Sequence, residues 1–213
     1  LIFESPAQKK QGSWQDYLSY SVASKIAVAP DKIYCATTGG LFFYDLQDNS
    51  ANKIADFLQL SDFGIKTIAF SETNDVLIIA YNNSNIDLIK NGRVFNLSDI
   101  KRKQLSSDKT INNISFIYEE AWLACGFGIV VINLKKQEIK DTYLIGENGS
   151  TLGVNDIGTD GEYIYAATNK GILKAQKEGV NLLDYHNWIQ IQNIPHYTEK
   201  FNLVELHAGK IIA

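Results

Sequence analysis

Short apolar runs recur along the chain, and in each run apolar residues alternate with polar or small ones. Ile26 and Val28 follow this pattern, as do Ile68 and Phe70 in a later segment. Alternation with a period of two is typical of β-strands. The runs are bounded by residue types that favour tight turns, at Pro30-Asp31, Asn74-Asp75 and Asp160-Gly161. No helix-period pattern of comparable length competes, so the sequence predicts an all-β fold.

The strand pattern repeats with a nearly constant period. Each copy has an apolar run, a turn, a second run that ends near a small residue, a Gly or Asn turn and a third apolar run. The small residues, here called the anchor alanines, are Ala36, Ala80, Ala124, Ala167 and Ala213. They lie 44, 44, 43 and 46 residues apart. This period matches the roughly 40–50 residues of a four-stranded propeller blade.

The repeat therefore predicts a β-propeller of four-stranded antiparallel blades over residues 14–213. The predicted blades span about 22–58, 65–98, 111–145 and 154–192, with a partial unit at 201–213. Each complete blade is expected to end in an outer strand, at residues 52–57, 93–97, 138–144 and 187–192. We expect the anchor alanines to let neighbouring blades approach closely, with bulkier residues such as Leu41 and Phe43 filling the space between blades.

The ends of the repeat predict an incomplete ring. Residues 13–20 resemble the outer strand around Trp188 and are predicted to close the ring, with residues 1–12 as an N-terminal extension. About 4.5 blades are present, whereas a seven-bladed ring needs about 308 residues. A four-bladed ring would close within the chain but would leave the fifth unit unexplained. We expect the other blades to come from the remainder of a longer chain or from a second copy.

Composition narrows the functional classes. The chain has 213 residues, 45% of them hydrophobic, and a formal net charge of −4. Its acidic balance argues against a nucleic-acid scaffold, and Lys101-Arg102-Lys103 is interpreted as a solvated loop. No apolar run reaches the roughly 18–20 residues that span a bilayer, so the chain is not expected to cross a membrane. The absence of Met predicts a processed or trimmed product.

Several short sequences match fragments of motifs with known chemistry. Asp62-Phe63-Gly64 matches a kinase metal-binding tripeptide, but the other kinase motifs are missing. Gly126-Phe127-Gly128 precedes a predicted strand, whereas a dinucleotide fingerprint precedes a helix. Cys35 and Cys125 fall two blades apart and are interpreted as small buried residues. We therefore interpret these motifs as structural.

The remaining chemical candidates are histidines, acids and loops. His186, His196 and His207 lack metal-ligand spacing, although His196 and Glu199 stand three residues apart. Asp156, Asp160 and Glu162 lack the spacing of a Ca²⁺ loop and are interpreted as turn formers. No catalytic residue, cofactor or metal is predicted, and the chain is expected not to be an enzyme. A lyase or glycosidase would need acids or histidines clustered on one face. Two long loops, 146–153 and 176–186, are candidate binding loops, with no ligand-binding residue assigned.

Two stretches resemble a known repeat. VNDIGTDGEYIYAATNKGIL (154–173) and VASKIAVAPDKIYCATTGGLFFYD (22–45) resemble the repeat of two-component regulator propellers. The link LQLSDFGIKTIAF (58–70) is similar to the Leu-Ser-Asp link of that repeat. This resemblance covers residues 14–213 and implies the propeller fold.

A narrower resemblance implies a function. WQDYLSYS (14–21), FNLSDIKRK (95–103), CGFGIVVINLKKQEIKDTYLIG (125–146) and the segment 64–92 resemble the N-terminal propeller of PorZ-like proteins of Bacteroidota. The resemblance implies two propellers followed by a C-terminal sorting domain. It also implies a non-enzymatic component of the type IX secretion attachment complex, exported to the periplasm or the cell surface. Secretion-complex proteins and anionic lipopolysaccharide are the implied partners.

A second hypothesis belongs to a different functional class. The resemblance to the two-component regulator repeat also implies the periplasmic sensor of a hybrid two-component regulator, which reads glycan fragments. A second propeller and a sorting domain after Ala213 would favour the secretion role, whereas a transmembrane helix with a kinase core would favour the sensor.

Overall fold

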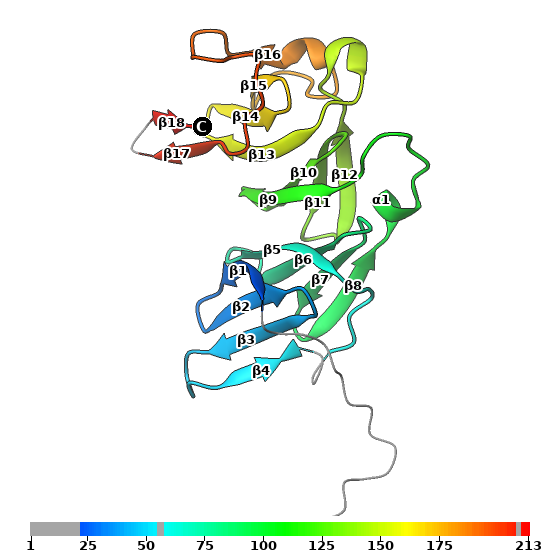
Figure 1. Cartoon of the computed structure of the whole chain (residues 1–213), viewed down its shortest axis with the longest axis vertical. Coiled ribbons are helices and arrows are strands. Elements are labelled where there is room, and N and C mark those ends of the chain that lie inside the picture. The colour runs from blue at the N-terminus through cyan, green and yellow to red at the C-terminus, as the bar shows by residue number, and fades with distance from the viewer. Residues whose placement is uncertain (1–21, 55–57, 208–209) are drawn as a thin grey trace, which may run out of the picture.

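The protein is a stack of small antiparallel β-sheets, described by a computed structural model over residues 22–54, 58–207 and 210–213 (Figure 1). Blade 1 contains β1 (Ala23–Val28), β2 (Lys32–Thr37), β3 (Leu41–Asp45) and β4 (Ala51–Lys53), and blade 2 contains β5 (Ile65–Ser71), β6 (Val76–Tyr81), β7 (Ile86–Lys90) and β8 (Arg93–Leu97). Blade 3 contains β9 (Ile111–Ile117), β10 (Glu120–Cys125), β11 (Gly128–Asn133) and β12 (Glu138–Tyr143), and blade 4 contains β13 (Val154–Thr159), β14 (Tyr163–Thr168), β15 (Gly171–Gln176) and β16 (Ile189–Gln190). Every blade pairs its strands in chain order. The prediction of four-stranded antiparallel propeller blades is confirmed.

A backbone contact recurs at the start of all four blades. The residue two positions after each anchor alanine donates its N–H to the carbonyl just before the first strand of its own blade. The donor–acceptor pairs are Thr38–Val22 (3.3 Å), Asn82–Gly64 (2.9 Å), Gly126–Thr110 (2.9 Å) and Asn169–Gly153 (3.0 Å). Next to this contact the pairing of the first and second strands shifts by one residue in every blade. The sequence repeat is therefore also a repeat of backbone geometry.

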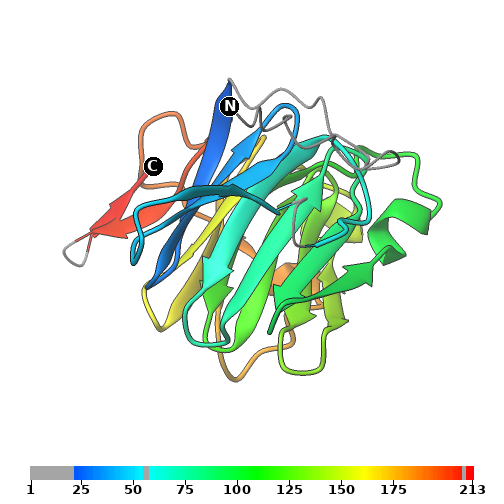
Figure 2. The same ribbon diagram turned by 90° about the horizontal axis from the view of Figure 1, so that it is seen from below.

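The first strand of each blade lies innermost in the stack. β1 contacts β5, β5 contacts β9, and β9 contacts β13, while the outer strands fan away from this line (Figure 2). Three apolar clusters fill the seams between consecutive blades. Since neighbouring sheets bury one another in this way, most of the core lies between blades, as in other repeat proteins.

Three of the anchor alanines pack in these seams, and Ala167 packs against Val204 beside blade 4. Ala36, Ala80, Ala124 and Ala167 are at most 1% exposed. Ala36 lies in the cluster between blades 1 and 2, Ala80 in that between blades 2 and 3, and Ala124 in that between blades 3 and 4. Leu41 and Phe43 share the cluster of Ala36. A larger side chain at an anchor would have to push two sheets apart, which explains the small residues.

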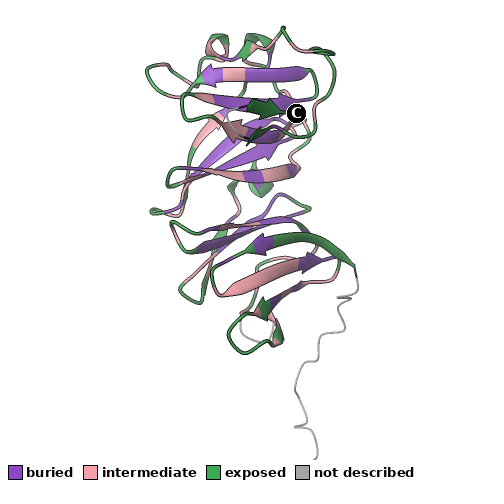
Figure 3. Cartoon of the chain, turned by 90° about the vertical axis from the view of Figure 1, so that its left-hand side faces the viewer, coloured by how far each residue is buried: buried purple, intermediate pink, exposed green. Residues whose placement is uncertain are grey.

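One face of blade 1 differs from its counterparts. In blades 2, 3 and 4 the preceding blade covers Ile68, Ile114 and Ile157, which are 1%, 6% and 3% exposed. The residue in the same register in blade 1 is Ile26, which is 62% exposed. Figure 3 shows β1 as a largely exposed strand beside the buried strands of the other blades. Blade 1 therefore presents an apolar face of the kind that a neighbouring blade covers elsewhere in the molecule.

Some predicted boundaries were wrong. The outer strand predicted at 187–192 is limited to β16, because Asn187 belongs to the 3₁₀ turn η3 (Tyr185–Asn187) and the indole N–H of Trp188 donates to Leu182 O at 3.0 Å. The strand predicted at 138–144 ends at Tyr143, and the link after β8 contains a short helix, α1 (Asp99–Arg102).

The fifth unit begins with two paired strands, as the repeat predicts. It is a hairpin of β17 (Glu205–His207) and β18 (Lys210–Ile212), and Ala213 directly follows β18. Val204, just before β17, is buried against blade 4. Residues 1–12, 13–20 and 55–57 lie outside the described residues, so the ring-closing strand and the domain limits stay predictions.

Candidate functional site

The two candidate binding loops lie together on one side of blades 3 and 4. The loop 146–153 forms the turn η2 (Glu147–Gly149), and the loop 176–186 leads into η3. The two turns are in contact, and the Tyr185 hydroxyl donates to the Asn148 side-chain oxygen at 3.3 Å. The sequence singled out both loops, but their meeting depends on the stacking of the two blades.

The first loop is held closed by its own backbone. Gly146 donates to Ser150 O at 3.0 Å, and Ser150 donates to Glu147 O at 3.1 Å. A Cβ at Gly146 would lie 2.6 Å from the carbonyl oxygen of Ser150, so only glycine fits there. The short closed turn holds the Glu147 side chain beside blade 4.

The second loop is braced by side chains. Asp184 caps η3 by accepting the His186 backbone N–H at 3.0 Å, and its carboxylate also lies 2.7 Å from His186 Nδ1. Asn187 Nδ2 donates to Asn181 O at 2.9 Å. Together with the hydrogen bond from Trp188 to Leu182 O, these contacts fix the conformation of the loop 176–186.

A pocket of about 630 Å³ lies between the loops and the seam of blades 3 and 4. Its buried lining includes Ile145, Leu173 and Trp188. Polar and aromatic side chains also line it, namely Glu147, Lys170, Tyr185, His186 and Gln190. A concave apolar floor with a few polar groups is the usual form of a small-molecule site. Lys170, Trp188 and Gln190 were not assigned from sequence, because they lie on other strands and turns and reach the pocket only through folding.

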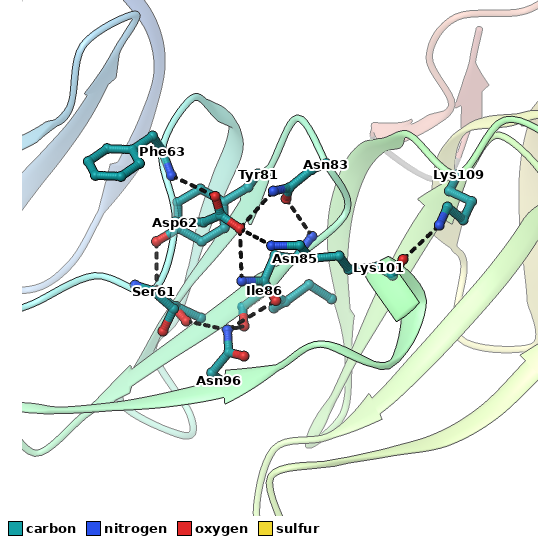
Figure 4. A network of polar contacts seen from close by, with 11 residues as sticks. Ser61, Asp62, Phe63, Tyr81, Asn83, Asn85, Ile86, Asn96, Lys101 and Lys109 are labelled. Carbon is teal, nitrogen blue, oxygen red and sulfur yellow. Dashed lines mark hydrogen bonds and ion pairs between the residues drawn. The ribbon is translucent and has the colours of Figure 1, made fainter. Parts of the chain in front are cut away.

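The Asp62-Phe63-Gly64 motif is part of a structural network (Figure 4). The Asp62 carboxylate accepts hydrogen bonds from Asn83 Nδ2 at 2.7 Å, Asn85 Nδ2 at 3.2 Å and Lys101 Nζ at 2.6 Å. These partners, Lys101 first and Asn83 next, lower the pKa of Asp62 to about 2. The motif thus ties the link between blades 1 and 2 to α1, as its structural interpretation expected.

A buried acid lies beside that network. Asp87 is fully buried and accepts hydrogen bonds from Ser61 N at 2.8 Å, Tyr81 Oη at 2.7 Å and Asn96 Nδ2 at 2.8 Å. Burial, and then the hydrogen bond to Asp87, raise the pKa of Tyr81. Since the carboxylate is bound by three donors, we assign it a structural role.

The other acids and histidines also have local roles. Asp156 is 4% exposed and joins Asn113 to the backbone of Val204, whereas Asp160 accepts the N–H groups of Glu162 and Tyr163 in a turn. His196 Nδ1 lies 2.9 Å from Glu199 on the surface. Within the described part of the chain, no group of three or more His, Cys, Asp or Glu side chains is placed to hold a metal ion.

The glycine motif and the cysteines likewise fill structural positions. Gly128 opens β11 with a φ of 151°, and Phe127 is buried in the core. Cys35 and Cys125 are free thiols, and burial raises the pKa of both. Cys125 is buried as predicted, whereas Cys35 is only half-buried, so the prediction was wrong for Cys35. The part of the chain with assigned structure contains no helix long and apolar enough to cross a membrane.

The stacked blades define the class of this protein as a partial β-propeller with about four blades. The model of the type IX secretion system PorZ N-terminal β-propeller domain matches residues 33–189. The chain therefore belongs to the family of PorZ N-terminal β-propellers. No curated protein matches the sequence significantly.

Solved structures extend this picture. PorZ of Porphyromonas gingivalis, an essential surface component of its type IX secretion system, shares 25% identity and a TM-score of 0.79 over 91% of this chain and 25% of its own. The extracellular domain of a hybrid two-component system from B. thetaiotaomicron shares 15% identity and a TM-score of 0.60 over 83% of this chain and 24% of its own. AztD of Citrobacter koseri shares 14% identity and a TM-score of 0.52 over 74% of this chain and 44% of its own. The last two likenesses show the fold alone, and the chain spans a quarter of the length of the PorZ structure.

Proposed function

We propose that this chain is a propeller of a non-enzymatic binding scaffold that supports type IX secretion and the attachment of cargo to anionic lipopolysaccharide. The observation that carries the proposal is the family match over residues 33–189. The fold similarity to a surface component of that secretion system supports it. In this role the chain is exported and acts in the periplasm or at the outer-membrane surface.

The absence of enzymatic activity is part of the proposal. Buried acids such as Asp87, which accepts three hydrogen bonds, have structural tasks. The loops and blade seams offer surfaces for binding, and propeller loops commonly carry this function.

We also propose that a further blade covers the exposed face of blade 1. Ile26 and Val28 are 62% and 69% exposed, whereas the equivalent isoleucines of the next three blades are buried by a preceding sheet. A blade from the remainder of a longer chain or from a second copy would cover this face in the same way.

A second candidate is the ligand-sensing propeller of a hybrid two-component regulator that reads glycan fragments. The structural similarity to the extracellular domain of such a system supports it. That similarity has a lower identity and a lower TM-score than the similarity to PorZ, so we place it second.

Deletion of the gene in its source bacterium tests both candidates. The scaffold role predicts that cargo proteins accumulate inside the cell envelope and that surface-attached cargo is lost, with recovery when the gene is restored. Normal cargo attachment in the deletion strain would refute the scaffold. If such a strain also failed to induce genes in response to added glycans, the sensor role would replace it.

A further inference from the structure

The pocket between blades 3 and 4 has aromatic rings among its lining residues. The ring centroids of Tyr185 and His186 lie 4.0 Å apart, and both rings belong to the pocket lining. Tyr185 is half-buried and His186 is exposed. At a centroid separation of 4.0 Å the two rings cover one face of each other. The opposite face of an aromatic ring is electron-rich, so it attracts the C–H groups on the face of a pyranose ring. Buried Trp188 and Leu173 add apolar surface to the same pocket.

The polar groups of the pocket complement hydroxyl groups. Glu147 offers a carboxylate acceptor and Lys170 an ammonium donor, and both side chains are exposed. Neither has a side-chain partner among residues of assigned structure. His186 Nδ1 is bound to Asp184, which leaves Nε2 for a ligand. A sugar hydroxyl both donates and accepts, so it can bind all three groups.

The charges of the lining favour an uncharged ligand. Glu147 and Lys170 carry opposite charges, so their fields largely cancel for a ligand that contacts both. For a phosphate, repulsion by Glu147 offsets the attraction of Lys170, and for a cation the reverse holds. The pocket therefore selects for shape and hydroxyl groups more than for net charge.

The lining is held in place without a ligand. The Tyr185 hydroxyl binds Asn148, the Trp188 indole binds Leu182 O, and Gln190 Nε2 donates to Lys170 O at 2.8 Å. Binding to a braced pocket loses less conformational entropy than binding to mobile loops.

We propose that this pocket binds an uncharged saccharide of one or two pyranose units, stacked on Tyr185 and hydrogen-bonded to Glu147 and Lys170. The inference deepens the proposed surface role and rests on it for the source of the sugar. That source is either a unit of the cell-surface polysaccharide or a free oligosaccharide.

Saturation-transfer NMR with the purified chain tests the proposal. One arm uses free N-acetylglucosamine, galactose, chitobiose and lactose, and the other uses delipidated surface polysaccharide of the source bacterium. We expect saturation of ring protons in at least one arm, with at least tenfold weaker affinity in Tyr185→Ala. Glu147→Gln keeps the loop shape and is expected to weaken binding at least threefold. Phe63→Ala, an exposed aromatic outside the pocket, serves as the matched control with unchanged affinity.

The two arms identify the source, since binding only in the first indicates a free oligosaccharide and binding only in the second a surface polysaccharide. No saturation in either arm would overturn the inference. The same saturation in the parent chain and in both pocket variants, with circular dichroism unchanged, would also overturn it. Loss of binding in 0.5 M salt would show an ionic ligand and would also overturn it. These results do not depend on cargo attachment in the deletion strain, so the pocket and the scaffold role can fail separately.

Discussion

The side-chain amide of Asn113 in β9 donates a 2.6 Å hydrogen bond to the carboxylate of Asp156 in β13. The bond crosses the seam between blades 3 and 4 at their innermost strands. The second carboxylate oxygen of Asp156 accepts the backbone N–H of Val204 at 2.9 Å, so one buried acid joins blade 4 to the elements on both sides.

Replacement of Asp156 tests this joint. Asp156→Ala leaves the amide of Asn113 and the buried N–H of Val204 without their acceptor, and we expect a loss of about 2–4 kcal/mol in the free energy of unfolding. Asp156→Asn retains one acceptor oxygen and should cost about half as much. Urea unfolding followed by tryptophan fluorescence measures both. Equal stability of the alanine variant and the parent chain would show that Asp156 does not stabilise the contact between blade 4 and its neighbours.

The pKa of Asp62 predicts a pH dependence of stability. Its folded pKa of about 2 lies below the ordinary 3.8, so the network stabilises the fold above about pH 4 and loses this contribution as the pH falls toward 2. Because Lys101 is partly exposed, the contribution is screened to about 1 kcal/mol.

Asp62→Asn should therefore lower stability at pH 7 and flatten the decline between pH 4 and 2, measured by urea unfolding at several pH values. Asp75→Asn is the control, since Asp75 is an exposed turn residue with a positive φ that asparagine tolerates. A parallel decline of the Asp62 variant and the parent would contradict the prediction.

The hydroxyl of Thr67 is buried and has no hydrogen-bond partner among residues of assigned structure. Thr67→Val replaces this hydroxyl with a methyl group of similar size, and we expect unchanged stability or a gain of up to about 1 kcal/mol. Thr67→Ser keeps the hydroxyl but removes the methyl group, and should cost about 1 kcal/mol. Thermal unfolding compares the two. A strongly destabilised valine variant would show that the hydroxyl binds a group such as an ordered water.

Gly128 combines a positive φ with close packing. A Cβ there would lie 2.3 Å from the carbonyl oxygen of Tyr143 in β12. We expect Gly128→Ala to cost about 3 kcal/mol, through both backbone strain and displacement of β12. Gly92 also has a positive φ but has open space around it, so Gly92→Ala should cost about 1 kcal/mol. Equal losses in chemical unfolding would mean that the contact with Tyr143 is unimportant.

The exposed face of blade 1 predicts association. Ile26→Lys combined with Val28→Lys should leave the free energy of unfolding of the chain within about 0.5 kcal/mol, because both side chains are largely exposed. The same changes should prevent a second copy or an added blade from covering the face. Light scattering of the parent and the variant measures this. A parent chain that stays monomeric at high concentration, and a longer chain unaffected by the substitutions, would exclude the proposed interface.

The local sequence pattern was enough to predict the repeat. Apolar alternation and the spacing of Ala36, Ala80, Ala124 and Ala167 were sufficient for the blade fold, because each blade forms its strands by local hairpin pairing. The same local information predicted that 146–153 and 176–186 are long loops. It also predicted an outer strand around Trp188 that was too long, because the hydrogen bond from the indole to Leu182 O cannot be read from a strand pattern.

Which residues meet across the seams depends on how the blades stack. Each anchor alanine of blades 1 to 4 lies opposite a residue of the first strand, namely Lys25, Thr67, Asn113 and Asp156. The hydrogen bond between Asn113 and Asp156 forms only because blades 3 and 4 stack. In the same way, Tyr185 and Glu147 line one pocket because two blades stack in a fixed register. Contacts between blades depend on the packing of whole sheets, and a local pattern of apolar and polar residues carries no record of that packing.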